Sequence, residues 1–442
     1  MPPCLLNPLR VMPAGSAAPL ERLRRGPRVE ATRAEAGPGS VTRALRPALL
    51  VAAGLGLLPF RPGAAPAGRW WCSLAALRSA LVSAAALALL VVDAARARPA
   101  GAWRPSGAAR VFVRLRQLHG PLLWAGTVLW VWRRPPQLIT FFDACRRHEV
   151  VFGALDLRSS ARYVRRFVTS ILVIEAFYVV MIFVHTAEVP TWRQLLSLIP
   201  LLCVYGGVIF WLIIFIGCCW CLQEALAALD GRLQEALDGR LQEALDGRLQ
   251  EALDGRLQEA LAALDGRLQE ALDGRPGAAV VGSAAAPRLC RLVRQHGQLC
   301  RLVELLSETF GGFVAFYLCM LQLDVALTAY LNLRALSAPA GGGSALPALL
   351  LKNVLTPVPL VLLRLAAAAG DGVGRQTRRA AGLLRRRLPV AERHLTELLH
   401  LLEGQQAAAD LAGYFTLDNT FFVQSMKDII TLVIVMAQFE LA

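Results

Sequence analysis

Three residues near the C-terminal end of the chain share a spacing that places them on one side of a helix. Thr431, Val435 and Gln438 stand at positions i, i+4 and i+7 of an otherwise apolar stretch, and this spacing follows one helical face. Thr and Gln in a membrane helix either form hydrogen bonds between helices or face water. In the second case Val435 is an apolar constriction of an aqueous pore, and Glu440 attracts cations at its outer mouth.

Ionisable side chains inside other apolar stretches are a second sign of chemistry. Glu175, Asp324 and Lys352 lie where a charged group is costly and usually functional. Asp324 and Lys352 either form a structural ion pair between two helices or bind a polar ligand. Aromatic and imidazole side chains at similar depth indicate a cavity for a small organic molecule or, alternatively, the aromatic belt of the membrane interface. The candidate pocket residues are Tyr178, His185, Tyr205, Asp324, Tyr330 and Lys352.

No motif in the sequence indicates catalysis. The HExxH, GxSxG and phosphate-binding-loop patterns are absent, so we expect neither an enzyme nor a cofactor. The cluster of Cys218, Cys219 and Cys221 has the residue type for metal binding or acylation. Because thiols at a membrane edge are more often unpaired packing residues, we expect no metal site there.

The composition places these residues in a membrane protein. Of 442 residues, 55% are hydrophobic and 18% are charged, whereas soluble domains carry about 25% charged residues. The net charge of +15 comes almost entirely from Arg, since Lys352 and Lys427 are the only lysines. The Arg clusters flank apolar stretches, so they indicate membrane topology and not a nucleic-acid partner.

Seven apolar stretches are long enough to cross a bilayer, which requires about 20 residues. We therefore predict an all-α, polytopic membrane protein with seven transmembrane helices. The second stretch is the weakest, because Arg114, Arg116 and His119 interrupt it. An eighth stretch, 47–60, is too short and predicts an interfacial or re-entrant helix. The seven stretches are 71–93, 111–132, 167–186, 195–222, 310–333, 345–363 and 421–441.

The loops between these stretches predict their direction, because basic residues accumulate in short cytoplasmic loops. Arg is abundant before the first stretch and in the loops after the second and sixth, whereas the loops after the third and fifth contain only Arg193 and Arg334. This pattern predicts a cytoplasmic N-terminus and an extracellular C-terminus. The predicted parts are a cytoplasmic tail with the short helix (1–70), helices one to four (71–222), a cytoplasmic loop (223–309), helices five and six (310–363), a second cytoplasmic loop (364–420) and helix seven (421–442).

The first long cytoplasmic loop contains a tandem repeat. The unit LQEALDGR, or its longer form LQEALAALDGR, recurs over residues 222–275. Leu at the first and fifth positions predicts a short helical stripe, and Asp-Gly is expected to break the helix after each unit. We expect a solvated, dispensable insertion; the alternative is a partner-binding array.

The C-terminal segment 413–439, GYFTLDNTFFVQSMKDIITLVIVMAQF, resembles the signature of insect gustatory receptors. That family has a Gly-x-Phe-x-Leu-Asp stretch followed by a last helix with the pattern TYhhhhhQF, where h is apolar. Leu432 replaces the usual Tyr of the second pattern. The upstream segment LCRLVELLSETFGGFVAFYL resembles the family's cytoplasmic helix that runs into the fifth span. The matching residues are Gly413, Phe415, Leu417, Asp418, Thr431, Gln438 and Phe439.

The resemblance implies a tastant-gated, non-selective cation channel in the plasma membrane of sensory neurons. It also implies assembly as a homotetramer, or as a heteromer with other gustatory receptors, with the last helices around a central pore and the cytoplasmic loops as an anchor. Thr431, Gln438 and Phe439 then belong to the pore helix, and lipid surrounds the assembly. Two other classes stay open: a G-protein-coupled receptor, which needs the opposite topology, and a secondary transporter, which needs related halves.

Overall fold

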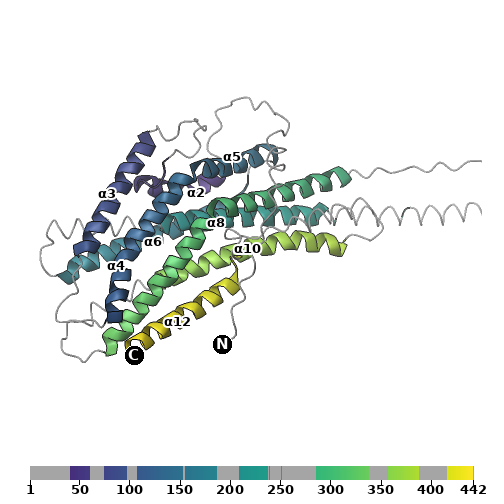
Figure 1. Cartoon of the computed structure of the whole chain (residues 1–442). Helices are drawn as coiled ribbons and strands as arrows, with labels where there is room; N and C mark the ends of the chain where they lie inside the picture. The colour runs from purple at the N-terminus through teal and green to yellow at the C-terminus, as the bar shows by residue number, and fades with distance from the viewer. Residues whose placement is uncertain are drawn as a thin grey trace, which may run out of the picture. The chain divides into compact units, whose positions relative to one another are not determined.

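The computed structural model describes residues 40–59, 74–96, 107–152, 155–186, 209–236, 285–337, 357–387 and 416–441, together with the isolated residues Asp238 and Gln250. These residues form long helices and no β-strand (Figure 1), as the all-α prediction requires. The helices are α2 (Ser40–Gly54), α3 (Leu74–Arg96), α4 (Gly107–Arg133), α5 (Pro135–Phe152), α6 (Arg158–Thr186), Ile209–Ala236, α8 (Ala285–Ser337), α10 (Pro357–Arg387) and α12 (Asn419–Leu441).

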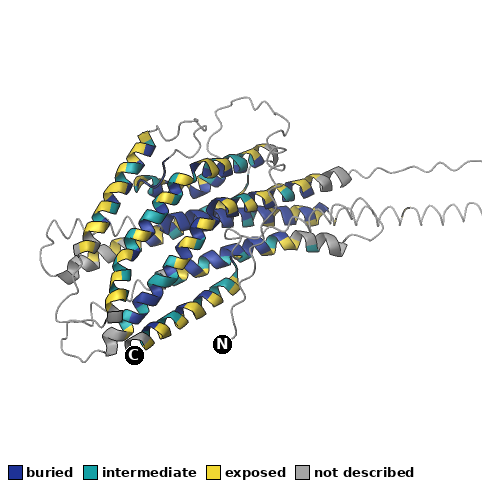
Figure 2. Ribbon diagram, in the orientation of Figure 1, coloured by how far each residue is buried: buried dark blue, intermediate teal, exposed yellow. Residues whose placement is uncertain are grey.

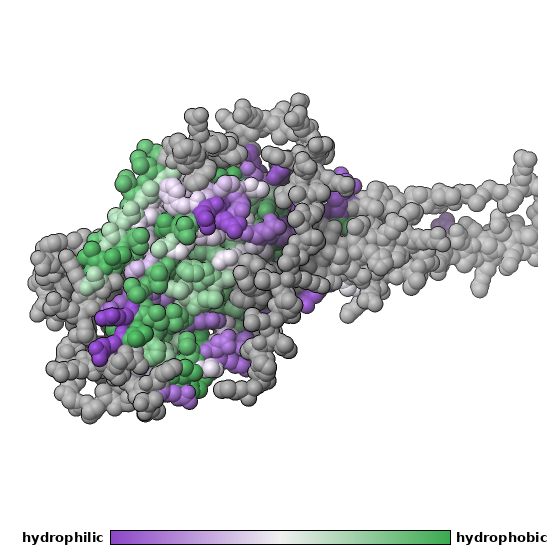
Figure 3. Space-filling view, in the orientation of Figure 1, coloured by the Kyte–Doolittle hydropathy of each residue, from purple (hydrophilic) through white to green (hydrophobic). Residues whose placement is uncertain are grey.

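Several of these helices have the length and composition of membrane spans. Four apolar segments qualify, and they overlap the predicted spans one, four, five and seven: Leu74–Val92, Ile209–Ala236, Arg291–Leu333 and Asn419–Gln438. α4 and α6 cover the predicted spans two and three, and α10 begins near the end of the predicted span six. In Figure 3 apolar side chains gather over α3 and α4, whose outward-facing Leu and Val residues are exposed.

α8 is much longer than a membrane is thick. It contains 53 residues, which at 1.5 Å per residue extend about 80 Å, whereas the hydrocarbon layer is about 30 Å. Its C-terminal part coincides with the predicted span 310–333, so its N-terminal part projects out of the bilayer. The helix expected to run from the cytoplasmic loop into the fifth span is therefore continuous.

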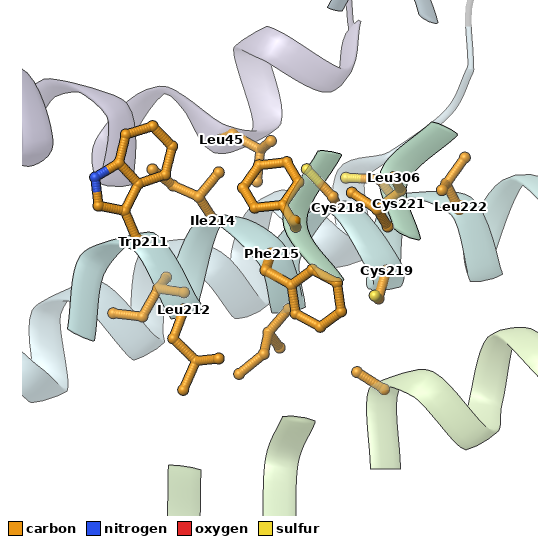
Figure 4. Close-up of a cluster of buried hydrophobic side chains, with 14 of the residues drawn as sticks. Leu45, Trp211, Leu212, Ile214, Phe215, Cys218, Cys219, Cys221, Leu222 and Leu306 are labelled. Carbon is orange, nitrogen blue, oxygen red and sulfur yellow. The ribbon is translucent and has the colours of Figure 1, made fainter. Parts of the chain in front are cut away.

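The helix Ile209–Ala236 forms the centre of the main hydrophobic core. Every residue from 209 to 219 is buried, and a helix that is apolar all round belongs in the interior. Trp211 lies 5.2 Å from Trp130 of α4 and 6.2 Å from Phe310 of α8, measured between ring centroids. Figure 4 shows this core around Trp211, Ile214 and Phe215, with Leu45 of α2 and Leu306 of α8 packed beside them.

The three clustered cysteines belong to this core. Cys218, Cys219 and Cys221 are at most 1% exposed, are not disulfide-bonded and lie among apolar side chains in Figure 4. Within the described residues no group of three His, Cys, Asp or Glu side chains is suited to a metal ion. These thiols pack against the core, and their burial keeps acylating reagents away from them.

The first repeat unit, residues 222–232, is part of the core, and two predictions about it were wrong. The central helix continues through Asp230 and Gly231 as far as Ala236, so Asp-Gly does not break it. Leu222, Leu226 and Leu229 are buried, so this unit is not a solvated insertion. A glycine within a helix costs about 1 kcal/mol, which the burial of three leucine side chains more than offsets. The later units lie almost entirely outside the described residues.

Two glutamates cap the first turns of distant helices. Glu149 of α5 accepts hydrogen bonds from the backbone N–H and hydroxyl of Ser40, at 2.8 and 2.6 Å, where α2 begins. Glu224 of the first repeat unit accepts hydrogen bonds from the backbone N–H and hydroxyl of Ser160, at 3.0 and 2.5 Å, in the first turn of α6. N–H groups in a first turn have no partner within their own helix, and a carboxylate there also favours the helix dipole. α2 consequently starts at Ser40, earlier than the predicted residue 47.

Replacing Glu224 with Ala will destabilise the protein. The change leaves the buried Ser160 without its acceptor, and hydrogen bonds to charged groups contribute about 1.5–3 kcal/mol. We expect a lower melting temperature of the detergent-solubilised protein, measured by fluorescence-detected size-exclusion chromatography. Glu235, at the same position of the next repeat unit, is exposed, so Glu235→Ala is the matched control and should melt like the wild type. Equal melting temperatures for the two variants would show that Glu224 does not support α6.

Candidate functional site

α12 contains the three residues with pore-like spacing and has two unlike sides. Its inner side, Ser425, Ile429 and Met436, is buried and packs against α8 and α4. Thr431, Val435 and Gln438 lie together on the exposed side, although α12 is apolar enough to span a membrane. Figure 2 shows this exposed side along the length of α12. Only 17% of the apolar, membrane-length stretch of α12 is buried, against 72% for that of the central helix. Most of the surface of α12 is therefore available for other contacts.

The start of α12 is positioned by two residues of the C-terminal signature. The Asp418 side chain accepts a hydrogen bond of 2.8 Å from the backbone N–H of Phe421, so Asp418 is the N-cap of α12. Leu417 is 1% exposed and packs against Gly370 of α10, where a Cβ atom would clash with the Leu417 carbonyl oxygen. Gly370 therefore allows α10 and the start of α12 to approach closely.

A row of polar side chains continues this contact between α10 and α12. Asn419 accepts a hydrogen bond from Arg364 and donates one of 2.6 Å to Asp371. Asp371 also pairs with Arg375 at 3.3 Å. The Arg364 guanidinium lies 5.4 Å from the centre of the Phe422 ring, a cation–π distance. These polar contacts and the close approach at Gly370 thus attach the first turn of α12 to α10.

The opposite half of α12 shares a second hydrophobic cluster with α8 and α4. Val325, Leu327 and Tyr330 of α8 are buried together with Ile429 and Met436 of α12. Phe112 of α4 meets the Tyr330 ring edge to face, with centroids 5.3 Å apart. Leu432, which stands where the signature usually has Tyr, packs against the same cluster. Tyr330 of the candidate pocket therefore belongs to the packing that supports α12.

Asp324, another candidate pocket residue, lies near a histidine that the sequence did not indicate as functional. His119 of α4 is 3% exposed, and its Nε2 lies 3.0 Å from the Met320 carbonyl oxygen. Because a carbonyl only accepts, Nε2 must carry the proton in this contact. Nδ1 lies 3.9 Å from the Asp324 carboxylate. His119 therefore contacts polar atoms of α8. These contacts explain how the predicted second span can contain a buried histidine.

The other predicted site residues are only partly described. Tyr178 and His185 belong to α6, and Phe439 and Glu440 belong to α12, but their side chains lie outside what the structure describes. Tyr205 and Lys352 lie outside the described residues altogether, as do Gly413 and Phe415. The structure thus brings together Asp324 and Tyr330 along the α4 side of α8, and Thr431, Val435 and Gln438 along α12.

α5, which packs against α8, contains two buried titratable groups. His148 of α5 is buried, and burial lowers its pKa, although Glu149 and the backbone of Gln295 act in the opposite direction. Burial disfavours the charged form of Cys145 in α5 as well, and because that form is the thiolate, burial raises the pKa of the Cys145 thiol. Both side chains are consequently neutral near pH 7.

The long apolar helices, the central buried span and the one-sided C-terminal helix define a multi-pass α-helical membrane protein. A family model described as 7tm Chemosensory receptor matches residues 45–442, and the chain belongs to that family. This confirms the resemblance found in the C-terminal signature. The family is one of receptors and not of enzymes.

Solved structures of an insect receptor have the same fold. The olfactory receptor OR5 from Machilis hrabei matches with a TM-score of 0.59 in its complex with eugenol and 0.58 in a second structure. Each comparison covers 90% of this chain and 98% of OR5, at 13% sequence identity. No curated protein sequence matches closely enough to add to this comparison.

Several residues that position α12 were not predicted from the sequence. The signature gives Asp418 no role of its own, although an Asp three residues before the first apolar residues of a helix is a recognisable N-cap. Gly370, Asn419 and Asp371 had no signal of their own, because their function depends on the contact between α10 and α12. In the sequence, His119 only makes the second span less apolar.

Proposed function

We propose that this protein is a gustatory chemoreceptor that acts as a tastant-gated, non-selective cation channel. The observation that carries the proposal is the exposed row of Thr431, Val435 and Gln438 on a membrane-length helix. Polar groups in a span are costly when they face lipid. Surrounding a shared aqueous pore with copies of α12 gives Thr431 and Gln438 water, while Val435 forms the apolar constriction and Glu440 stands at the outer mouth.

The assembly that fits this proposal is a homotetramer, or a heteromer with other gustatory receptors, in the plasma membrane of sensory neurons. Loop charges support a cytoplasmic N-terminus and an extracellular C-terminus. The cytoplasmic parts of α8, α10 and the central helix then form the anchor between subunits. The predicted extents of the cytoplasmic segments, 1–70, 223–309 and 364–420, belong to the same proposal.

The proposed tastant site lies in the outer half of each subunit. Tyr178, His185, Tyr205, Asp324, Tyr330 and Lys352 are the candidate contacts, and OR5 in complex with eugenol supports a small-molecule ligand. Tyr330 packs in the same cluster as Ile429 and Met436 of α12. Ligand contacts at Tyr330 can therefore alter the packing of the pore helix without any direct contact between ligand and pore.

A ligand panel tests this function directly. The chain is expressed alone and with sister receptors, and calcium entry is recorded for sugars, bitter compounds and volatile aromatics, eugenol included. A response that requires external calcium and persists when G-protein signalling is blocked supports the channel. A response that depends on G proteins, with an N-terminal tag exposed outside intact cells, would replace the channel with a G-protein-coupled receptor.

A further inference from the structure

The exposed row on α12 extends further toward the start of the helix than the three residues with pore-like spacing. Gln424 and Asp428 are exposed and continue the alternating steps of four and three residues that relate Thr431, Val435 and Gln438, so all five lie on one face. A second exposed row, next to the first, consists of Val423, Lys427, Ile430 and Ile434 and is apolar except for Lys427.

Asp428 lies inside the membrane-length part of α12. It stands nine residues after Asn419, the first residue of the span Asn419–Gln438, which corresponds to about 13 Å along the helix axis. A carboxylate at this depth is costly unless it meets water or a partner group. The Gln424 amide donates a hydrogen bond of 3.0 Å to one of its oxygens, which fixes the side chain along the same row.

We infer that Asp428 determines the ion preference of the pore. In the assembly proposed above, on which this inference rests, four copies of Asp428 form a ring of carboxylates on the inner side of the Val435 constriction. Carboxylate oxygens are hard ligands that suit Ca²⁺ and other hard cations, and rings of Asp or Glu favour cations in channels. Gln424 orients each carboxylate, and Gln438 lies on the opposite side of the constriction.

Permeation through Asp428→Asn tests this inference. The Asp428→Asn variant and its parent both carry Val435→Ala, which opens the constriction without a ligand. Each purified protein is recorded in planar bilayers with Na⁺ and Ca²⁺. We expect the permeability ratio of Ca²⁺ to Na⁺ to fall about threefold. The difference in conductance between Asp428→Asn and its parent should shrink between about 0.01 M and 0.1 M salt, because the screening length falls from about 30 to 10 Å.

Two matched variants separate a pore position from a general charge effect. Asp428→Glu retains the carboxylate and should restore the preference for Ca²⁺. Lys427→Gln changes the charge by one unit of opposite sign on the neighbouring row and should alter the ratio little. An unchanged ratio in Asp428→Asn at equal protein density, or an effect of the same size in Lys427→Gln, would overturn the inference.

A second readout distinguishes failure of this inference from failure of the proposed function. If neither the Val435→Ala parent nor the wild type with an active compound from the ligand panel carries current, the proposed channel function fails, and Tb³⁺ luminescence of the purified assembly then decides about Asp428. Terbium binding that is at least about tenfold weaker in Asp428→Asn than in Lys427→Gln supports a cation site at this carboxylate. Equal terbium binding by both variants contradicts it.

Discussion

Val435→Ala will give a channel that conducts without ligand. An apolar constriction closes a narrow pore by excluding water, and a smaller side chain widens the constriction and lowers that barrier. Val435 is exposed, and the buried side of α12 is made by other residues, so the substitution should leave the fold intact. We expect basal cation current to rise roughly tenfold, measured by whole-cell recording at equal surface expression.

Ile434→Ala is the matched control for this result. Ile434 has a similar size, is also exposed and lies next to Val435, but it belongs to the neighbouring row with Val423 and Ile430. Its truncation should therefore leave the basal current unchanged. A closed Val435→Ala channel, or equal basal currents in the two variants, would assign the constriction to another residue.

Gly370→Ala will disrupt the attachment of α12 to α10. A Cβ at this position would clash with the Leu417 carbonyl oxygen and come within 2.9 Å of the Leu417 Cβ. Since the clash involves backbone, the start of α12 must move, and overpacking of this kind costs about 1–3 kcal/mol. We expect reduced surface expression in cells and a lower melting temperature in detergent.

Gly382→Ala in the same helix is the control with the opposite expected sign. No atom lies within 4 Å of a Cβ at Gly382, and replacing Gly with Ala inside a helix stabilises by about 0.5–1 kcal/mol. This gain in helix propensity applies to both positions, so the difference between the variants measures the clash. If Gly370→Ala is as stable as Gly382→Ala, the close approach of α10 and Leu417 does not support α12.

The sequence predicted most of the features that depend on one helix at a time. Apolar length located the spans that include Leu74–Val92 and Asn419–Gln438, and helical spacing placed Thr431, Val435 and Gln438 on one side of α12. The signature around Leu417 and Asp418 indicated the family, and its two patterns are local. Such features follow from hydropathy and from the 3.6-residue period alone.

Features that depend on tertiary contacts were not predictable in the same way. The sequence of the first repeat unit recurs unchanged at 257–267, so its burial follows only from the central helix that precedes it. Glu224 caps α6 because that helix begins nearby in space, 64 residues away in sequence. His119 has a charged neighbourhood in sequence, with Arg114 and Arg116, and its contacts to Met320 and Asp324 form only when α4 packs on α8.

The central claim is that α12 lines a cation-conducting pore, and single-channel recording of Gln438→Ala tests it most directly. Purified wild-type and variant proteins are reconstituted in planar bilayers and compared at equal protein density, with an active compound from the ligand panel present. We predict cation-selective openings in both, with a changed unitary conductance and changed relative permeabilities in Gln438→Ala, because the exposed amide contacts permeating ions. Openings with normal permeation in Gln438→Ala, or a receptor that responds in cells but never conducts in the bilayer, would contradict the claim.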